Sequence, residues 1–108
     1  MTSPWIAELP VVFLHPNGRR ADGRIAVGLP FVVDERQASC PVALDGMDTL
    51  RMPISGGEPL QALLLAVRFL GARLHDFKTK GGRVLHRGDD ECEVELDAFF
   101  GPLLRPAT

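Results

Sequence analysis

The chain has 108 residues, of which 45% are hydrophobic and 24% charged, and its formal net charge is −2 at pH 7. This length and composition are typical of one soluble globular domain with a single core. The slightly acidic balance argues against general nucleic-acid binding, which usually accompanies a strongly basic surface. Only two lysines stand among the 12 Lys and Arg residues and tyrosine is absent, a composition that suggests a GC-rich bacterial genome.

The first residues, MTSPWIAELP, show no basic stretch followed by an apolar run, so we expect no secretory signal and a cytoplasmic protein. The longest apolar run, residues 62–67, is far shorter than the ~20 residues that cross a bilayer. We therefore expect no contact with a membrane.

Residues 5–14 and 24–33 are β-rich runs, and we expect them to form a hairpin. The segment between them, residues 15–23, carries an Asn-Gly pair at 17–18 and an Asp-Gly pair at 22–23. Both pairs are turn signals, so the hairpin should have a long basic tip.

Two prolines, Pro10 and Pro30, interrupt these runs, and each should mark a strand edge or a bulge because proline donates no hydrogen bond to a sheet. A third strand is expected over residues 39–44. A short fourth one, residues 49–54, leads into Gly56 and Gly57.

Residues 58–77 predict the one long helix, because Gln61, Arg68 and His75 fall seven apart and form a narrow polar line. Apolar residues fill an arc of roughly 200°, wider than the usual stripe of a surface helix. We therefore expect this helix to be buried on more than one side. The middle of the arc, expected to face the sheet, consists of Leu63, Val67, Leu70 and Leu74.

The start of the helix follows from local chemistry. Pro59 suits the first helical position, Glu58 can accept hydrogen bonds from the first turn, and Gln61 can reach back. Glycines before a helix can also bind an anion, but a phosphate loop normally adds a lysine, so a cap is the preferred interpretation. Arg73 interrupts the apolar arc and should extend its guanidinium to water.

A second hairpin is expected from residues 83–87 and 91–96, after a turn at 78–82. In its outer strand three glutamates alternate with Cys92, Val94 and Leu96, which predicts one wet face and one buried face. Phe99 and Phe100 should then close the core. The tail, residues 105–108, should be frayed.

These elements predict one domain over residues 1–108, an α+β fold in two layers, with an antiparallel sheet (a meander plus the C-terminal hairpin) packed on one long helix. A sheet face covers only one side of a helix. The rest of the apolar arc should be covered by the Phe99-Phe100 segment or by a second subunit, so we expect a homodimer.

No catalytic, metal or cofactor motif is found, and we expect none to be needed. The two cysteines, Cys40 and Cys92, are interpreted as core residues, because zinc sites usually show paired ligands. The acidic turn at residues 89–91 lacks the ligand spacing of a calcium loop.

Five residues are candidates for an interaction surface. Arg19, Arg20 and Arg24 lie near the hairpin tip, where they could meet phosphate or an acidic partner. Arg68 and His75 belong to the polar line of the helix. Exposed arginines also serve solubility alone, and His75 could be merely solvated.

The helix opening GGEPLQALLLAVRFLGARL, followed by Gly81-Gly82 and a strand, resembles a family of short bacterial domains of unknown function with a G-x-D-x-x-Q-A-L helix start. The motif is matched here by Gly56, Gly57, Glu58, Gln61, Ala62 and Leu63, with Glu58 in place of Asp. The resemblance covers about 30 residues, supports the fold, and implies no activity.

Two classes of function remain open. The first is a protein-interaction or accessory module, immunity-like in character, that binds an unknown protein through a sheet edge or the helix arc. The second is a small-molecule-binding protein or enzyme with a pocket between helix and sheet, using Arg68, His75 or Cys40. An exposed apolar patch would favour the first, and a concave pocket with converging polar groups the second.

Overall fold

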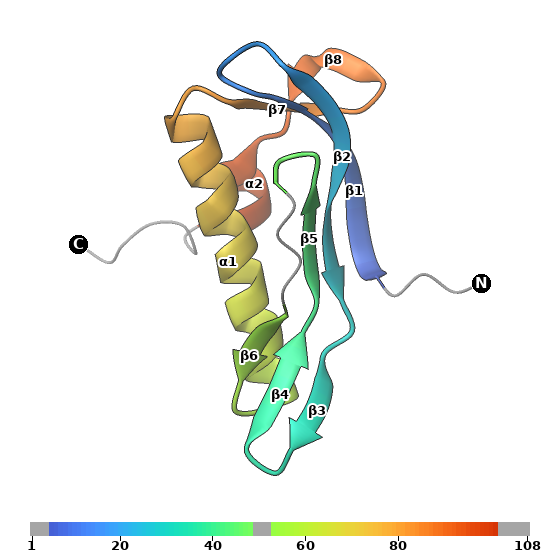
Figure 1. Cartoon of the computed structure of the whole chain (residues 1–108), viewed down its shortest axis with the longest axis vertical. Helices are drawn as coiled ribbons and strands as arrows, with labels where there is room; N and C mark the ends of the chain where they lie inside the picture. The colour runs from blue at the N-terminus through green and yellow to red at the C-terminus, as the bar shows by residue number, and fades with distance from the viewer. Residues whose placement is uncertain (1–4, 49–52, 102–108) are drawn as a thin grey trace.

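The computed structural model describes residues 5–48 and 53–101. The elements along this part of the chain are β1 (Trp5–Leu14), β2 (Arg20–Gly28), β3 (Phe31–Asp34), β4 (Gln37–Cys40), β5 (Val42–Asp45), β6 (Ile54–Gly56), α1 (Pro59–Thr79), β7 (Arg83–His86), β8 (Asp89–Glu93) and α2 (Leu96–Phe100). Figure 1 shows α1 running alongside the strands for most of the length of the molecule.

The strands form two antiparallel sheets. The larger has the order β5-β2-β1-β7-β8 and the smaller the order β3-β4-β6. The long helix α1 packs on β4 and β6 of the small sheet and touches β2, β5 and β7 of the large one. The α+β prediction, with antiparallel strands on one long helix, is confirmed, although the strands divide into two sheets.

The first hairpin is confirmed, but its tip is shorter than predicted. Strand β2 begins at Arg20, and the Asp22-Gly23 pair continues the strand opposite Val12 and Val11. A Cβ atom at Gly23 would lie 1.6 Å from the carbonyl oxygen of Asp45. The glycine therefore permits β5 to approach β2 closely, and no turn forms there.

Prolines divide two of the predicted strands. The run at residues 24–33 becomes β2 and β3, separated near Pro30, and the run at residues 39–44 becomes β4 and β5, separated at Pro41. The amide N–H of Gly28 donates to the carbonyl oxygen of Pro41 at 2.8 Å. This bond joins the two chain segments where they leave one sheet and enter the other.

The remaining strand predictions are partly testable. Pro10 lies in β1 just before the Val11–Leu14 stretch that pairs with β7, so it occupies a local edge as expected. Strand β6 covers the end of the predicted run at residues 49–54, of which 49–52 lie outside the described residues. The tail at 105–108 also lies outside them.

Helix α1 begins at Pro59, as predicted, and extends two residues beyond the predicted end. Gln61 reaches back and accepts a hydrogen bond from the N–H of Gly57 at 2.5 Å through its Oε1 atom. Glu58 makes no side-chain capping bond, contrary to the prediction. The Gln61 bond satisfies the N–H of Gly57, which lies before the helix, so the predicted reach back is confirmed without a side-chain cap on the first turn.

The buried side of α1 is displaced from the predicted one. Its fully buried residues are Ala62, Ala66, Leu70, Gly71 and Leu74. Leu70 and Leu74 therefore face the core as predicted, whereas Leu63 is only partly buried against it, and Val67 is partly buried without packing on it. The small sheet approaches so closely that a Cβ at Gly56 would lie 2.7 Å from the Ala62 nitrogen, which favours alanines on this side.

The core itself lies between α1 and the inner faces of both sheets. It includes Val11, Phe13, Leu44, Val84 and Val94, together with the buried residues of α1. The rings of Phe13 and Phe77 meet edge to face with centroids 5.6 Å apart. Arg73 pairs with Asp48 rather than extending to water alone, so that prediction is wrong.

The C-terminal hairpin is confirmed as β7 and β8, but Leu96 already starts α2. Phe100 packs against the core, while Phe99 stays exposed, so the predicted closure is half correct. Cys40 is buried as predicted. Cys92 is exposed, because β8 is an edge strand whose register with β7 shifts between Leu85 and His86.

Within the described residues, neither helix combines the length and the apolar character required to span a bilayer.

Candidate interaction site

Strand β3 exposes all four of its residues, three of which are apolar. The solvent-exposed fraction of the residue is 48% for Phe31, 65% for Val32 and 51% for Val33. Leu29, just before the strand, is 65% exposed. Apolar side chains in such a row usually lie in a core or an interface. Residues 31–33 therefore form the longest run of exposed apolar side chains on the described strands.

The position of β3 explains this exposure. It is the outer strand of the small sheet and, within the described residues, pairs only with β4. The turn after it is fixed by the Asp34 carboxylate, which accepts a hydrogen bond from the N–H of Arg36 at 2.8 Å. In Figure 1 the β3-β4 hairpin forms the lower end of the molecule, beside β6 and the start of α1.

Edge strands in natural proteins usually carry a device that prevents pairing with other chains, such as a lysine, a proline or an inward-pointing charge. The edge strand β8 follows this rule, since its sequence is DDECE. Strand β3, with the sequence FVVD, places its charge only at the last position. Although β3 is short and its register with β4 shifts between Val32 and Asp34, its outer edge at Phe31 and Val32 carries no charge or proline that would oppose an added strand.

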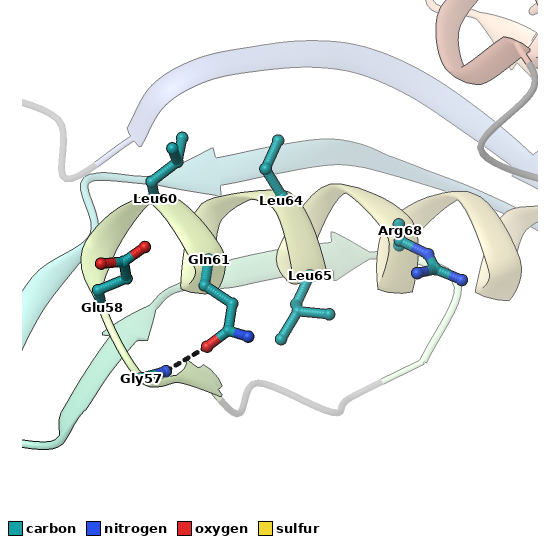
Figure 2. Close-up of a pocket in the computed structure, with 7 residues that line it drawn as sticks. All are labelled: Gly57, Glu58, Leu60, Gln61, Leu64, Leu65 and Arg68. Atoms are coloured by element: carbon teal, nitrogen blue, oxygen red, sulfur yellow. Dashed lines mark hydrogen bonds between the residues drawn. The ribbon is translucent and has the colours of Figure 1, made fainter.

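A second apolar surface lies on the outer side of α1, near its N-terminus. A shallow hollow of about 690 Å³ runs along the first three turns. Leu60 and Leu64 there are 62% and 53% exposed. Figure 2 shows the residues that line it, namely Gly57, Glu58, Leu60, Gln61, Leu64, Leu65 and Arg68.

A second hollow, of about 300 Å³, lies at the other end of α1 and is lined by several polar groups. Arg73 forms an ion pair with Asp48, and Lys80 pairs with Asp76 at 3.0 Å. His15 Nε2 lies 2.9 Å from the carbonyl oxygen of Gly46. Most of these groups are already paired, although Arg73 Nε is buried and has no hydrogen-bond partner among the described residues.

A groove of about 210 Å³ also separates the sheet from the helix. Its walls come from β1, β2, α1 and α2, and Glu8 is the only charged residue that lines it in the described part of the chain. A pocket between helix and sheet therefore exists, but it lacks the set of polar groups that orients a small ligand.

Of the three arginines predicted near the hairpin tip, the structure places Arg24 apart from Arg19 and Arg20. Arg19 lies in the short turn, where its N–H donates to Asn17 Oδ1 at 2.9 Å. Arg20 is the first residue of β2. Arg24 pairs with Asp45 at 2.9 Å and with Glu8 at 3.2 Å, and its guanidinium lies 5.3 Å from the centre of the Trp5 ring. Arg24 is thereby occupied within the sheet.

Arg68 and His75 are both exposed on the outer side of α1, two turns apart, as the polar line predicted. Cys40 lies in the core, fully buried, where its thiol donates to the Gly28 carbonyl at 3.4 Å. Burial raises the pKa of the Cys40 thiol. The three residues proposed for a pocket chemistry therefore do not converge on one site.

The sequence predicts only part of these two apolar surfaces. It places residues 31–33 in the hairpin strand 24–33, with Pro30 at an edge or bulge, and it places Leu60 and Leu64 in the wide apolar arc without distinguishing them from the residues that face the sheet. A signal was present for the first of them, since Pro30 before the run and the polar residues 34–37 after it shorten the strand to a hairpin of its own. Nothing local to the helix distinguishes Leu64 from Leu70.

In the described residues, no group of three or more His, Cys, Asp and Glu side chains is arranged to hold a metal ion.

No family model, curated protein or solved structure matches this chain.

Proposed function

We propose that this chain is a small protein-interaction module, of the accessory or immunity-like kind, that binds an extended segment of another protein at the outer edge of β3. The observation that carries the proposal is the exposure of Phe31, Val32 and Val33 on a strand with one neighbour. An added strand would complete the hydrogen bonding of this edge and cover the apolar side chains.

The chemistry of the segment follows from that of β3. The apolar side chains of β3 are exposed on both faces of the strand. The added strand should therefore be rich in β-branched and aromatic residues, which pair well with such side chains across strands. The polar turn after Asp34 limits the added pairing to about four residues, so we expect the segment to be short. Main-chain bonds would supply affinity and the side chains specificity.

The rival class is a small-molecule-binding protein or enzyme, and one observation favours it. The polar hollow at the C-terminal end of α1 gathers His15, Asp48, Arg73, Asp76 and Lys80. We rank it second because Arg73, Asp48, Asp76 and Lys80 are engaged in ion pairs with one another. A ligand there would first have to break these pairs.

The test uses a photo-crosslinking residue placed at position 32 in β3, with a matched position at Glu91 in β8, the edge strand that is rich in charge. The tagged protein is exposed to light in a lysate of the source organism. We expect a specific adduct from position 32 and none from position 91. The same adducts from both positions would mean that β3 is not a binding edge.

The identified partner is then purified and titrated against wild type, Val32→Lys and Glu91→Lys. A lysine on an edge opposes strand addition, so Val32→Lys should weaken binding at least about tenfold, while Glu91→Lys should not change it. Equal affinity for all three proteins would remove β3 from the proposal. Circular dichroism confirms that each variant is folded.

A further inference from the structure

Along the outer side of α1, an acidic residue, a group of leucines and a basic residue follow one another. Two antiparallel copies of this sequence of groups would be complementary to each other. Leu60, Leu64 and Leu65 occupy the middle of the hollow along its first turns. Glu58 lies at one end and Arg68 at the other, as Figure 2 shows. Ten residues separate the two charges, which corresponds to roughly 15 Å along a helix.

Both charges lack a partner within the described part of the chain. Glu58 forms no side-chain bond at the helix start. The side chains of Glu58 and Arg68 form no ion pair or hydrogen bond with a described residue. Other arginines are engaged, since Arg24 and Arg83 pair with carboxylates. Two opposite charges that flank exposed leucines thus remain available for intermolecular contact.

We propose that this face binds a second copy of the chain, with the two α1 helices antiparallel across a two-fold axis near residue 63. In that arrangement Glu58 of one protomer meets the partner's Arg68, and the partner's Glu58 meets Arg68 of the first. A two-fold interface is built from the same patch on both protomers. The distance between Glu58 and Arg68 that fits one contact therefore fits the other as well. The leucines of the two copies then meet between the charged ends.

A second copy of the chain already carries every group that the outer side of α1 requires of a binding partner. A foreign helix would need a basic group opposite Glu58, an acidic group opposite Arg68 and apolar residues between them at the same spacing. The chain itself carries this pattern in reverse order when a second helix runs antiparallel. Charge complementarity of this kind sets orientation and register more than affinity.

The contact is small, since it involves about three turns of each helix. Interfaces of low area form weak or transient complexes, so we expect micromolar rather than nanomolar association. The inference goes beyond the proposed function, because the face on α1 is separate from the edge of β3. A dimer could therefore present two copies of that edge.

The experiment is sedimentation velocity of the full chain over a wide concentration range. Wild type should shift from one to two chains as concentration rises. Glu58→Arg and Arg68→Glu should each weaken self-association at least about tenfold, because each places two pairs of like charges in contact. Glu91→Arg, a charge reversal of the same kind on exposed β8, is the matched control and should behave as wild type.

The decisive sample is an equimolar mixture of Glu58→Arg and Arg68→Glu. In a mixed dimer both contacts become Arg with Glu again, so the two weakly associating variants should pair with each other. The double variant Glu58→Arg/Arg68→Glu should also regain the wild-type dimer. Melting curves of each single variant show that the loss is not caused by unfolding.

Several results would overturn the inference. A wild type that stays a single chain at the highest concentration removes the dimer. A dimer that tolerates both charge reversals, or a mixture that fails to pair, places the contact elsewhere. Self-association lost in Val32→Lys but kept in Glu58→Arg would assign it to β3. Capture of a partner at β3 is measured separately, so failure of the dimer leaves the proposed function unaffected.

Discussion

At the residue scale, the two cysteines show how burial decides chemistry. Cys40 is enclosed in the core and its thiol donates to a backbone carbonyl, whereas Cys92 is exposed on an edge strand. Burial raises the pKa of the Cys40 thiol, which lowers the thiolate fraction that reacts. The same residue type is therefore inert at one position and accessible at the other.

We expect a thiol reagent to modify Cys92 rapidly in the native protein and Cys40 only after unfolding. One thiol per chain should react without denaturant and two in denaturant, as counted by mass spectrometry. Cys92→Ser is the matched control, and its native form should be unreactive. Rapid modification of both thiols in the native wild type would contradict the burial of Cys40.

Glu93 is the other residue whose chemistry is set by neighbours. Arg83 Nε donates to Glu93 Oε1 at 2.5 Å, and Lys78 lies 3.8 Å from the other oxygen. The hydrogen bond from Arg83 holds the pKa of the Glu93 carboxyl below its usual range. Because the folded protein then binds this proton less tightly than the unfolded chain, Glu93 stabilises the fold above the ordinary pKa of about 4.3.

This contribution should be lost as pH falls below that value. At neutral pH we expect Glu93→Gln to reduce the free energy of unfolding by up to about 1 kcal/mol, because the pair is partly exposed. The difference from wild type should shrink towards zero as the pH falls below the ordinary pKa of about 4.3 and through the lower pKa of the folded state. Urea titrations across pH measure it. A difference that is constant with pH would exclude the ion pair as its cause.

At the element scale, α1 has a buried side made of small residues and an outer side that retains leucines. Ala62 and Ala66 permit close approach of the small sheet, and Leu70 and Leu74 fill the space beyond it. Leu64 has the same side chain as Leu70 but is half exposed. The element therefore offers a matched pair of substitutions.

Leu70→Ala should lower the free energy of unfolding by about 2–5 kcal/mol, since it leaves a cavity in the core. Leu64→Ala should lower it by less than about 1 kcal/mol, as expected for an exposed position. Denaturant titrations of both variants, carried out at low protein concentration, give the comparison. Equal losses at the two positions would mean that the buried side of α1 is wrongly assigned.

Strand β2 contains a second position that depends on close approach. A Cβ at Gly23 would lie 1.6 Å from the Asp45 carbonyl oxygen of β5. Gly23→Ala should thus destabilise the protein by about 1–3 kcal/mol or more, because the backbone must move apart. Gly57→Ala is the control, since its nearest contact is the flexible Gln61 side chain at 3.2 Å. Similar melting temperatures for both variants would refute the close contact.

At the scale of the whole molecule, two connecting segments of the chain run from one sheet to the other. The β2-β3 and β4-β5 segments each cross from one sheet to the other, and α1 contacts both sheets. A core that includes residues of both sheets and of α1 cannot lose one of these parts without exposing the others. The described residues should therefore behave as one cooperative unit.

We expect the fluorescence of Trp5, which reports on β1, and far-UV circular dichroism, which reports mainly on α1, to give the same unfolding midpoint. The chain has one tryptophan, so the assignment of the fluorescence signal is direct. Two separate midpoints would show that the large sheet and the helix unfold independently.

The sequence alone determined the elements whose signals are local. The period of the polar line and Pro59 located α1, and turn residues located the hairpins, because these patterns act within a few neighbouring residues. Tertiary structure decided which of the apolar residues are covered. Arg24 and Asp45, 21 residues apart, pair because β5 lies beside β2. Phe31 is exposed because the chain after Pro30 enters the small sheet as its outer strand β3, while α1 packs on β4 and β6 of that sheet. Both depend on packing between distant segments, which periodicity along the chain does not encode.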